Sequence, residues 1–117
     1  MKILDTRVMR GPNCWSTRHP KLIVLRLGWQ SSERDAAIKI SHLVAFTALQ
    51  LQREAGVDCS YAMTGSPDAK DETEAVFEYV DEKVGLLAAR LATKVAESLW
   101  REERYNIAGD IRLVEEA

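Results

Sequence analysis

The chain has 117 residues, 46 % of them hydrophobic and 29 % charged, as expected for one globular domain. Its 16 basic and 18 acidic residues give a formal net charge of −2, and this near-balance argues against a dedicated nucleic-acid-binding protein. No stretch approaches the ~20 apolar residues of a membrane helix, and the N-terminus has no signal-type apolar core. We therefore expect a single cytoplasmic domain over residues 1–117, with neither a nucleic-acid nor a membrane partner.

The first part of the chain predicts two strands. Residues 2–9 (KILDTRVM) interleave charged side chains with β-compatible ones, and residues 21–27 (KLIVLRL) form a nearly continuous apolar run that is typical of a central, buried strand. The segment 10–20 between them (RGPNCWSTRHP) contains the turn sequence Gly-Pro-Asn and ends in proline, which predicts a loop.

A helix is predicted next, over residues 35–55. Either Ser31 or Ser32 is expected to cap its N-terminus, and Gly56 is expected to end it. Apolar residues recur at helical spacing and form one stripe: Ile40, Leu43, Val44, Thr47, Ala48, Leu51 and Ala55. His42 lies beside this stripe, and we interpret it as a half-buried core histidine.

The second part of the chain predicts a hairpin and another helix. Residues 57–64 (VDCSYAMT) alternate as a half-buried strand does, and residues 73–80 (TEAVFEYV) form a second strand after a polar, charged turn. Ala75, Phe77 and Tyr79 share one face of that strand. Residues 81–103 predict a helix with an inner stripe of Val84, Leu87, Ala88, Leu91, Ala92, Val95 and Leu99, and residues 104–117 predict a short terminal helix.

The order of these elements predicts an α+β fold. It is a two-layer β-β-α-β-β-α sandwich in which a four-stranded, mainly antiparallel sheet carries both helices on one face, followed by the short C-terminal helix.

Motifs for common catalytic and cofactor chemistry are missing from the sequence. It has no phosphate loop, no dinucleotide-binding glycine motif and no nucleophile elbow. Its two histidines, His19 and His42, have no cysteine pair beside them, and Cys14 and Cys59 form no CxxC motif. We interpret His19 as solvated and both cysteines as semi-buried thiols, and we expect no metal and no cofactor.

Several motifs together resemble one known family. RGPN-x-WS lies at residues 10–16, ALQLQREAG at 48–56, VFEY at 76–79 and AAR at 88–90, and the chain ends near YNIAGDIRLVEE. In this order they resemble the N-terminal domain of cyanophycin synthetases, along nearly the whole chain. RGPN-x-WS and VFEY are fairly specific in combination.

Two departures from that family bear on activity. The synthetases continue with an ATP-grasp domain and a Mur-ligase-like domain, which 117 residues do not accommodate. Members of the family often carry a His-x-x-Glu-His signature, in which two histidines bind a metal and the glutamate activates water. Here the aligned positions are His42, Ala45 and Phe46, so only the first histidine is kept. We therefore expect no enzymatic activity; a degenerate metallohydrolase is the most remote hypothesis.

The resemblance implies a ligand. In the synthetases this domain is thought to hold the growing polymer, which has an aspartate backbone and arginine side chains. Arginines would pair with its carboxylates and acids with its guanidinium groups, and a tryptophan would stack on a guanidinium plane. The candidate ligand-binding residues are Arg10, Asn13, Trp15, Ser16, Arg18, Arg26 and Glu78, with Arg7 and Glu74 beside them. The alternative is a purely structural interpretation, in which Trp15 covers the core at the sheet edge and Asn13 hydrogen-bonds to the backbone of the turn.

Two main hypotheses follow. The first is a non-catalytic binding module that engages a zwitterionic Asp/Arg polymer or peptide, or a partner ligase. The second is a homo-oligomeric structural or assembly protein, in which Trp29, Trp100 and the outer edge of the sheet form the interface.

Overall fold

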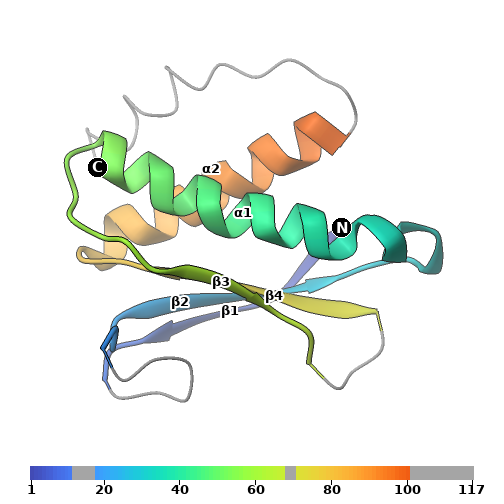
Figure 1. The fold of residues 1–117 in the computed structure, drawn as a ribbon, viewed down its shortest axis with the longest axis horizontal. Coiled ribbons are helices and arrows are strands. Elements are labelled where there is room, and N and C mark those ends of the chain that lie inside the picture. Colours follow the sequence, from blue (N-terminus) through green and yellow to red (C-terminus); the bar gives the residue numbers. More distant parts are fainter. Residues whose placement is uncertain (12–17, 68–70, 101–117) are drawn as a thin grey trace.

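The strands of the predicted sandwich form one sheet, and both helices cover the same face of it (Figure 1). The computed structural model describes residues 1–11, 18–67 and 71–100. Its elements in chain order are β1 (Lys2–Met9), β2 (Leu22–Gly28), the 3-10 turn η1 (Ser31–Glu33), α1 (Arg34–Glu54), β3 (Ala62–Gly65), β4 (Glu72–Glu78) and α2 (Glu82–Trp100). The predicted fold class and order of elements are confirmed.

The sheet has the strand order β1-β2-β4-β3, and every neighbouring pair is antiparallel. The apolar run of residues 21–27 is a central strand, as predicted, because β2 pairs with β1 on one side and with β4 on the other. β1 is an edge strand, and its register shifts between Ile3 and Asp5 at a β-bulge.

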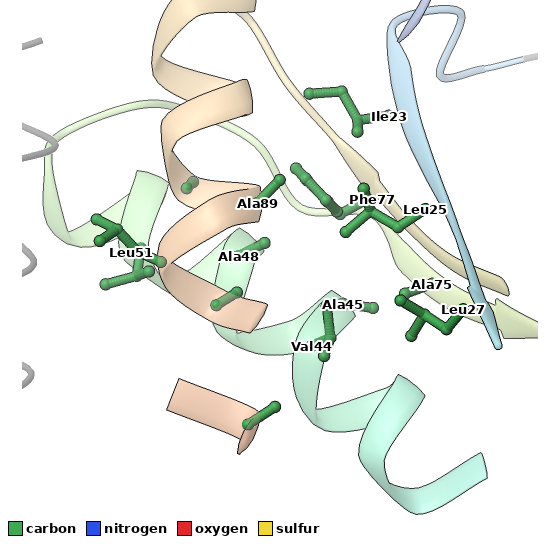
Figure 2. Close-up of a cluster of buried hydrophobic side chains, with 14 of the residues drawn as sticks. Ile23, Leu25, Leu27, Val44, Ala45, Ala48, Leu51, Ala75, Phe77 and Ala89 are labelled. Atoms are coloured by element: carbon green, nitrogen blue, oxygen red, sulfur yellow. The ribbon is translucent and has the colours of Figure 1, made fainter. Parts of the chain in front are cut away.

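The core lies between the sheet and the helices. Alternate residues of β2 and β4 point toward the helix layer and are buried: Ile23, Leu25 and Leu27 on β2, with Ala75 and Phe77 on β4 and Tyr79 directly after it. Figure 2 shows side chains from both strands gathered against α1, where Val44, Ala45 and Ala48 complete the layer. The prediction that Ala75, Phe77 and Tyr79 share a buried face is confirmed.

Small residues set how closely the helices approach each other and the sheet. Alanines line the inner faces of α1 and α2, so the two helices pack against each other over a long contact. At Gly85 the backbone of α2 lies so close to the sheet that an added Cβ would stand 2.7 Å from Tyr79 Cβ.

Some element boundaries differ from the predictions. β3 begins at Ala62 instead of residue 57, because the N–H groups of Val57 and Cys59 bond locally to the carbonyls of Gln52 and Val57. Neither Ser31 nor Ser32 caps α1: both lie in the 3-10 turn, where the Gln30 N–H donates to Glu33 Oε1 at 2.8 Å.

Two residues assigned to buried faces are exposed. Leu99 is 52 % exposed near the end of α2, and His42 lies on the outer surface of α1. The predicted C-terminal helix over residues 104–117 lies outside the described residues. Within the described part of the chain, no helix is both long and apolar enough to cross a bilayer.

Candidate functional site

The face of the sheet that points away from both helices carries most of the predicted ligand-binding residues that the structure describes; we call it the open face (Figure 1). Strand alternation decides which residues reach it. On β2, Leu22 and Val24 belong to a cluster separate from the main core, and Arg26 follows on the same side. On β4, Val76 belongs to that cluster, so Glu74 and Glu78 also point to the open face.

One half of the open face is apolar. Leu22, Val24 and Val76 are at most 5 % exposed. Met9, Tyr61 and Met63 pack against these three from β1, from the segment before β3 and from β3. Leu22, Val24 and Val76 are therefore covered by their neighbours and are not available to a ligand.

The other half carries a row of alternating charges across three strands. Asp5 on β1 pairs in register with Arg26 on β2, and Arg26 pairs in register with Glu74 on β4. Directly opposed residues of antiparallel strands have Cβ atoms about 4.5–5.5 Å apart. In register, Arg26 is therefore flanked by Asp5 on one neighbouring strand and by Glu74 on the other; we call Asp5, Arg26 and Glu74 the charged row.

Arg26 is half-buried, and its Nε atom is shielded from solvent without a hydrogen-bond acceptor among the described residues. No ion pair within residues 1–11, 18–67 and 71–100 involves Arg26, Asp5 or Glu74. A shielded donor without an acceptor costs free energy. Because this Nε is shielded, a carboxylate reaches it only when the Arg26 side chain moves, and the guanidinium can then bind the carboxylate in a bidentate manner.

Glu78, a second predicted site residue, is held by its neighbours. Its Oε2 lies 2.9 Å from His19 Nδ1, and its Oε1 accepts the Ser60 N–H at 2.8 Å. Burial raises the pKa of Glu78, but the hydrogen bonds from His19 and from the backbone N–H groups of Ser60 and Tyr61 outweigh burial and hold this pKa below its usual value.

His19 itself is placed differently from the prediction. It is half-buried, with its ring stacked on Tyr61 at a centroid distance of 4.7 Å, and is not a solvated loop residue. His19, Tyr61 and Glu78 are far apart in the sequence, so no sequence pattern predicts this contact. It arises because Glu78 at the end of β4 reaches both the loop that leads into β2 and the segment that leads into β3.

Arg10, another predicted ligand contact, forms an ion pair at the end of β1. Its Nε donates to Glu82 Oε1 at 2.8 Å, and both side chains are well exposed. Next to it, the Tyr79 hydroxyl donates to the Met9 carbonyl at 3.0 Å. Arg10 therefore connects β1 to the first turn of α2, a role that the sequence did not indicate.

The remaining candidates are dispersed. Arg7 reaches the open face opposite Val24, and Arg18 is exposed in the loop before β2. Asn13, Trp15 and Ser16, together with Cys14, lie outside the described residues, so their predicted roles stay predictions. Asp5 was missed at the sequence level, although pairing residues 2–9 with residues 21–27 would have placed it near Arg26.

The aromatic residues of the predicted oligomer interface differ in exposure. Trp29 is 8 % exposed, and its Nε1 donates to Thr73 Oγ1 at 2.7 Å, so it belongs to the core and does not present an interface. Trp100 is 39 % exposed, and its ring lies 6.3 Å from that of Trp29. The part of the interface hypothesis that relied on an exposed Trp29 is wrong.

Among the described residues, His42 belongs to no cluster of metal-ligating side chains. It is exposed on α1, and its ring stacks on Phe46 at a centroid distance of 4.2 Å. The prediction of a half-buried core histidine is wrong, because position 42 falls on the outer side of the helix. The described residues contain no group of three or more metal-ligating side chains.

Cys59 is buried, as semi-buried thiols were expected to be, and is free. Burial, together with the nearby charge of Glu78, raises the pKa of its thiol to about 11. A thiol with such a pKa is a poor nucleophile at neutral pH.

Comparison with known proteins gives a consistent match. Residues 31–101 match the model of the cyanophycin synthase-like N-terminal domain. The chain is similar to the cyanophycin synthetase of Synechocystis sp., with 30 % identity over 144 aligned positions, and to that of Geminocystis herdmanii, with 28 % identity. Each alignment covers 92 % of this chain but only 16 % of the relative's length.

Proposed function

The chain belongs to the cyanophycin synthase-like N-terminal domain family, and on that premise we propose that it is a non-catalytic binding module whose open face engages a zwitterionic, peptide-like polymer of aspartate and arginine. The observation that carries the proposal is the charged row, with the shielded Nε of Arg26 lacking an acceptor among the described residues.

The charges of the row are complementary to those of such a polymer. Arg26 would bind a carboxylate of the backbone, and the flanking Asp5 and Glu74 would bind guanidinium groups, since both pairings allow two parallel hydrogen bonds. The three side chains sit on neighbouring strands of one sheet, so their spacing is preorganised. A ligand of one sign alone would leave part of the row without a partner.

One feature supports a role without catalysis for this domain. Where the family's metal signature places a glutamate and a second histidine, this chain has Ala45 and Phe46. Alanine has no group that can activate water and phenylalanine has none that can bind a metal.

The test is calorimetric titration with short peptides of β-linked aspartate carrying arginine, beside poly-aspartate, at low and moderate salt. We expect the arginine-bearing peptide to bind, and Arg26→Gln to weaken binding about tenfold or more, as expected for loss of a charge-assisted hydrogen bond. Arg90→Gln is the matched control, because Arg90 is an exposed arginine on α2, in the layer on the opposite side of the sheet.

Binding of poly-aspartate as tight as that of the arginine-bearing peptide would contradict a zwitterionic site. Equal affinity of the Arg26→Gln protein and the wild type would remove the charged row from the proposal. Arg10→Ala in the same titration separates the two arginines, and we expect a smaller loss because Glu82 already holds the Arg10 Nε.

A further inference from the structure

We propose that the free edge of β1 pairs with the β1 of a second copy of this chain, antiparallel and around a two-fold axis at Thr6, so that two sheets join into one. This inference does not depend on the proposed ligand. It concerns the outer edge of the sheet and shares only Asp5 with the proposed ligand site, whose other two residues, Arg26 and Glu74, lie on β2 and β4.

The edge of β1 is available for pairing. β1 is the terminal strand of the sheet, and no described strand pairs with its outer side. The helix layer lies against β2, β3 and β4, which leaves six consecutive residues, Lys2–Arg7, exposed. Ile3 and Leu4 are 42 % and 45 % exposed. An edge strand of this length with exposed apolar side chains favours association with another strand.

Charge selects the register of this pairing. Asp5 and Arg7 both point to the open face, because they pair with Arg26 and Val24 of β2. A two-fold axis at Thr6 places Asp5 opposite Arg7 of the partner subunit, and the symmetry repeats that pair. An axis at Asp5 would oppose two aspartates, and an axis at Arg7 would oppose two arginines, which is destabilising.

Because of the β-bulge, residues on both sides of it meet partner residues that point to the same face of the sheet. One bulged residue near Leu4 takes no partner of its own. Beyond it, Ile3 comes opposite Val8 of the partner subunit, and both residues point toward the helix side, since they pair with Leu27 and Ile23. The same register therefore opposes unlike charges on the open face and apolar side chains on the other face.

β1 is also held in place before any partner arrives. Arg10 is bonded to Glu82 and the Met9 carbonyl to the Tyr79 hydroxyl at one end. The amino group of Met1 bonds to Glu33 at the other end, at 3.1 Å. A strand fixed at both ends loses little conformational entropy when it pairs.

The first test is the oligomeric state, measured by sedimentation equilibrium over micromolar concentrations. We expect a dimer for the wild type. Asp5→Arg and Arg7→Asp should each weaken dimerisation about tenfold or more, because two attractive contacts become two repulsive ones. The double variant Asp5→Arg/Arg7→Asp should restore it. Asp58→Arg, at an exposed aspartate outside the sheet, is the control.

The second test addresses the register. A residue on a two-fold axis faces its own copy, at a Cβ–Cβ distance close to that of a disulfide. Thr6→Cys in a Cys14→Ser background should therefore give a disulfide-linked dimer under mild oxidation. Lys2→Cys should not, and Cys59 is buried. A monomer at all concentrations, or a dimer that both charge reversals leave intact, would overturn the proposal. Circular dichroism checks that each variant is folded.

Discussion

The two faces of the sheet are built from the same strands but differ in what their side chains do. On β2, Leu25 is 1 % exposed within the helix-covered core, while the next residue, Arg26, reaches the open face with a shielded Nε that lacks an acceptor among the described residues. On β4, Phe77 lies in the helix-covered core (Figure 2), and the next residue, Glu78, reaches the open face. A shift of one residue along a strand thus separates stabilising positions from candidate binding positions.

We therefore expect stability and binding to change independently at these neighbouring positions. The helix-covered face removes apolar area from water, which is the main source of stability. The open face keeps charged groups that contribute little to folding and carry the proposed recognition. Substitutions at neighbouring residues test whether stability depends on one face of the sheet and binding on the other.

The largest expected effect comes from Leu25→Ala. Leu25 packs in the main core, so its truncation should lower the free energy of unfolding by about 2–5 kcal/mol. Arg26→Ala, one residue along, should cost about 1 kcal/mol or less, because the side chain is only half-buried and its shielded Nε makes no hydrogen bond to the described residues. Urea denaturation measures both. Similar losses for the two variants would show that the faces do not divide stability in this way.

The second prediction concerns the closest approach of α2 to the covered face. Gly85→Ala should destabilise the fold by about 1–3 kcal/mol, although alanine is intrinsically the better helix former. The added Cβ would also stand 2.9 Å from Ile23 Cδ1, where there is no room for it. Lys83→Ala, an exposed substitution in the same turn, is the control. An unchanged thermal midpoint for Gly85→Ala would mean that α2 shifts without cost.

The third prediction concerns a polar group on the covered face. Thr73 Oγ1 accepts the Trp29 indole N–H and shares a hydrogen bond with Ser41 Oγ, and all three residues are buried. Thr73→Val should cost about 1–2 kcal/mol, since it leaves the buried Trp29 indole N–H without its acceptor, while Ser41 keeps its bond to the Ala37 carbonyl. Thr73→Ser keeps the hydroxyl, so chemical denaturation should show a smaller loss. A larger loss for serine would assign the effect to packing.

Much of the fold was predictable because it depends on local patterns. The alternation of Ala75, Phe77 and Tyr79, the central apolar run and the glycine at position 56, with φ of 88°, all follow from short-range rules. β3 was predicted too long because alternation continues into residues 57–61, where the N–H groups of Val57 and Cys59 bond locally and that of Ser60 bonds to the Glu78 side chain.

The candidate site was less predictable because its contacts join distant segments. Arg26 was found, but Asp5 was not, since the register between β1 and β2 depends on a bulge near Leu4. The contact of His19 with Glu78 joins the loop before β2 to the end of β4, and the contact of Arg10 with Glu82 joins the end of β1 to the start of α2. The spacing of residues along one sequence does not predict contacts between such distant segments.

The smallest expected effect tests whether the open face contributes anything to stability through Glu78. Because the pKa of Glu78 is lower in the folded chain than in the unfolded chain, the stability from its bonds to His19 and Ser60 is present above the unfolded pKa of about 4.3. It is lost as the pH falls through the folded value. Glu78→Gln should therefore flatten the decrease in unfolding free energy below pH ~4.3, by about 1 kcal/mol or less. Urea denaturation across this range measures it. A parallel decrease in both proteins would assign the acid sensitivity to other carboxylates and leave the open face without a stabilising role at Glu78.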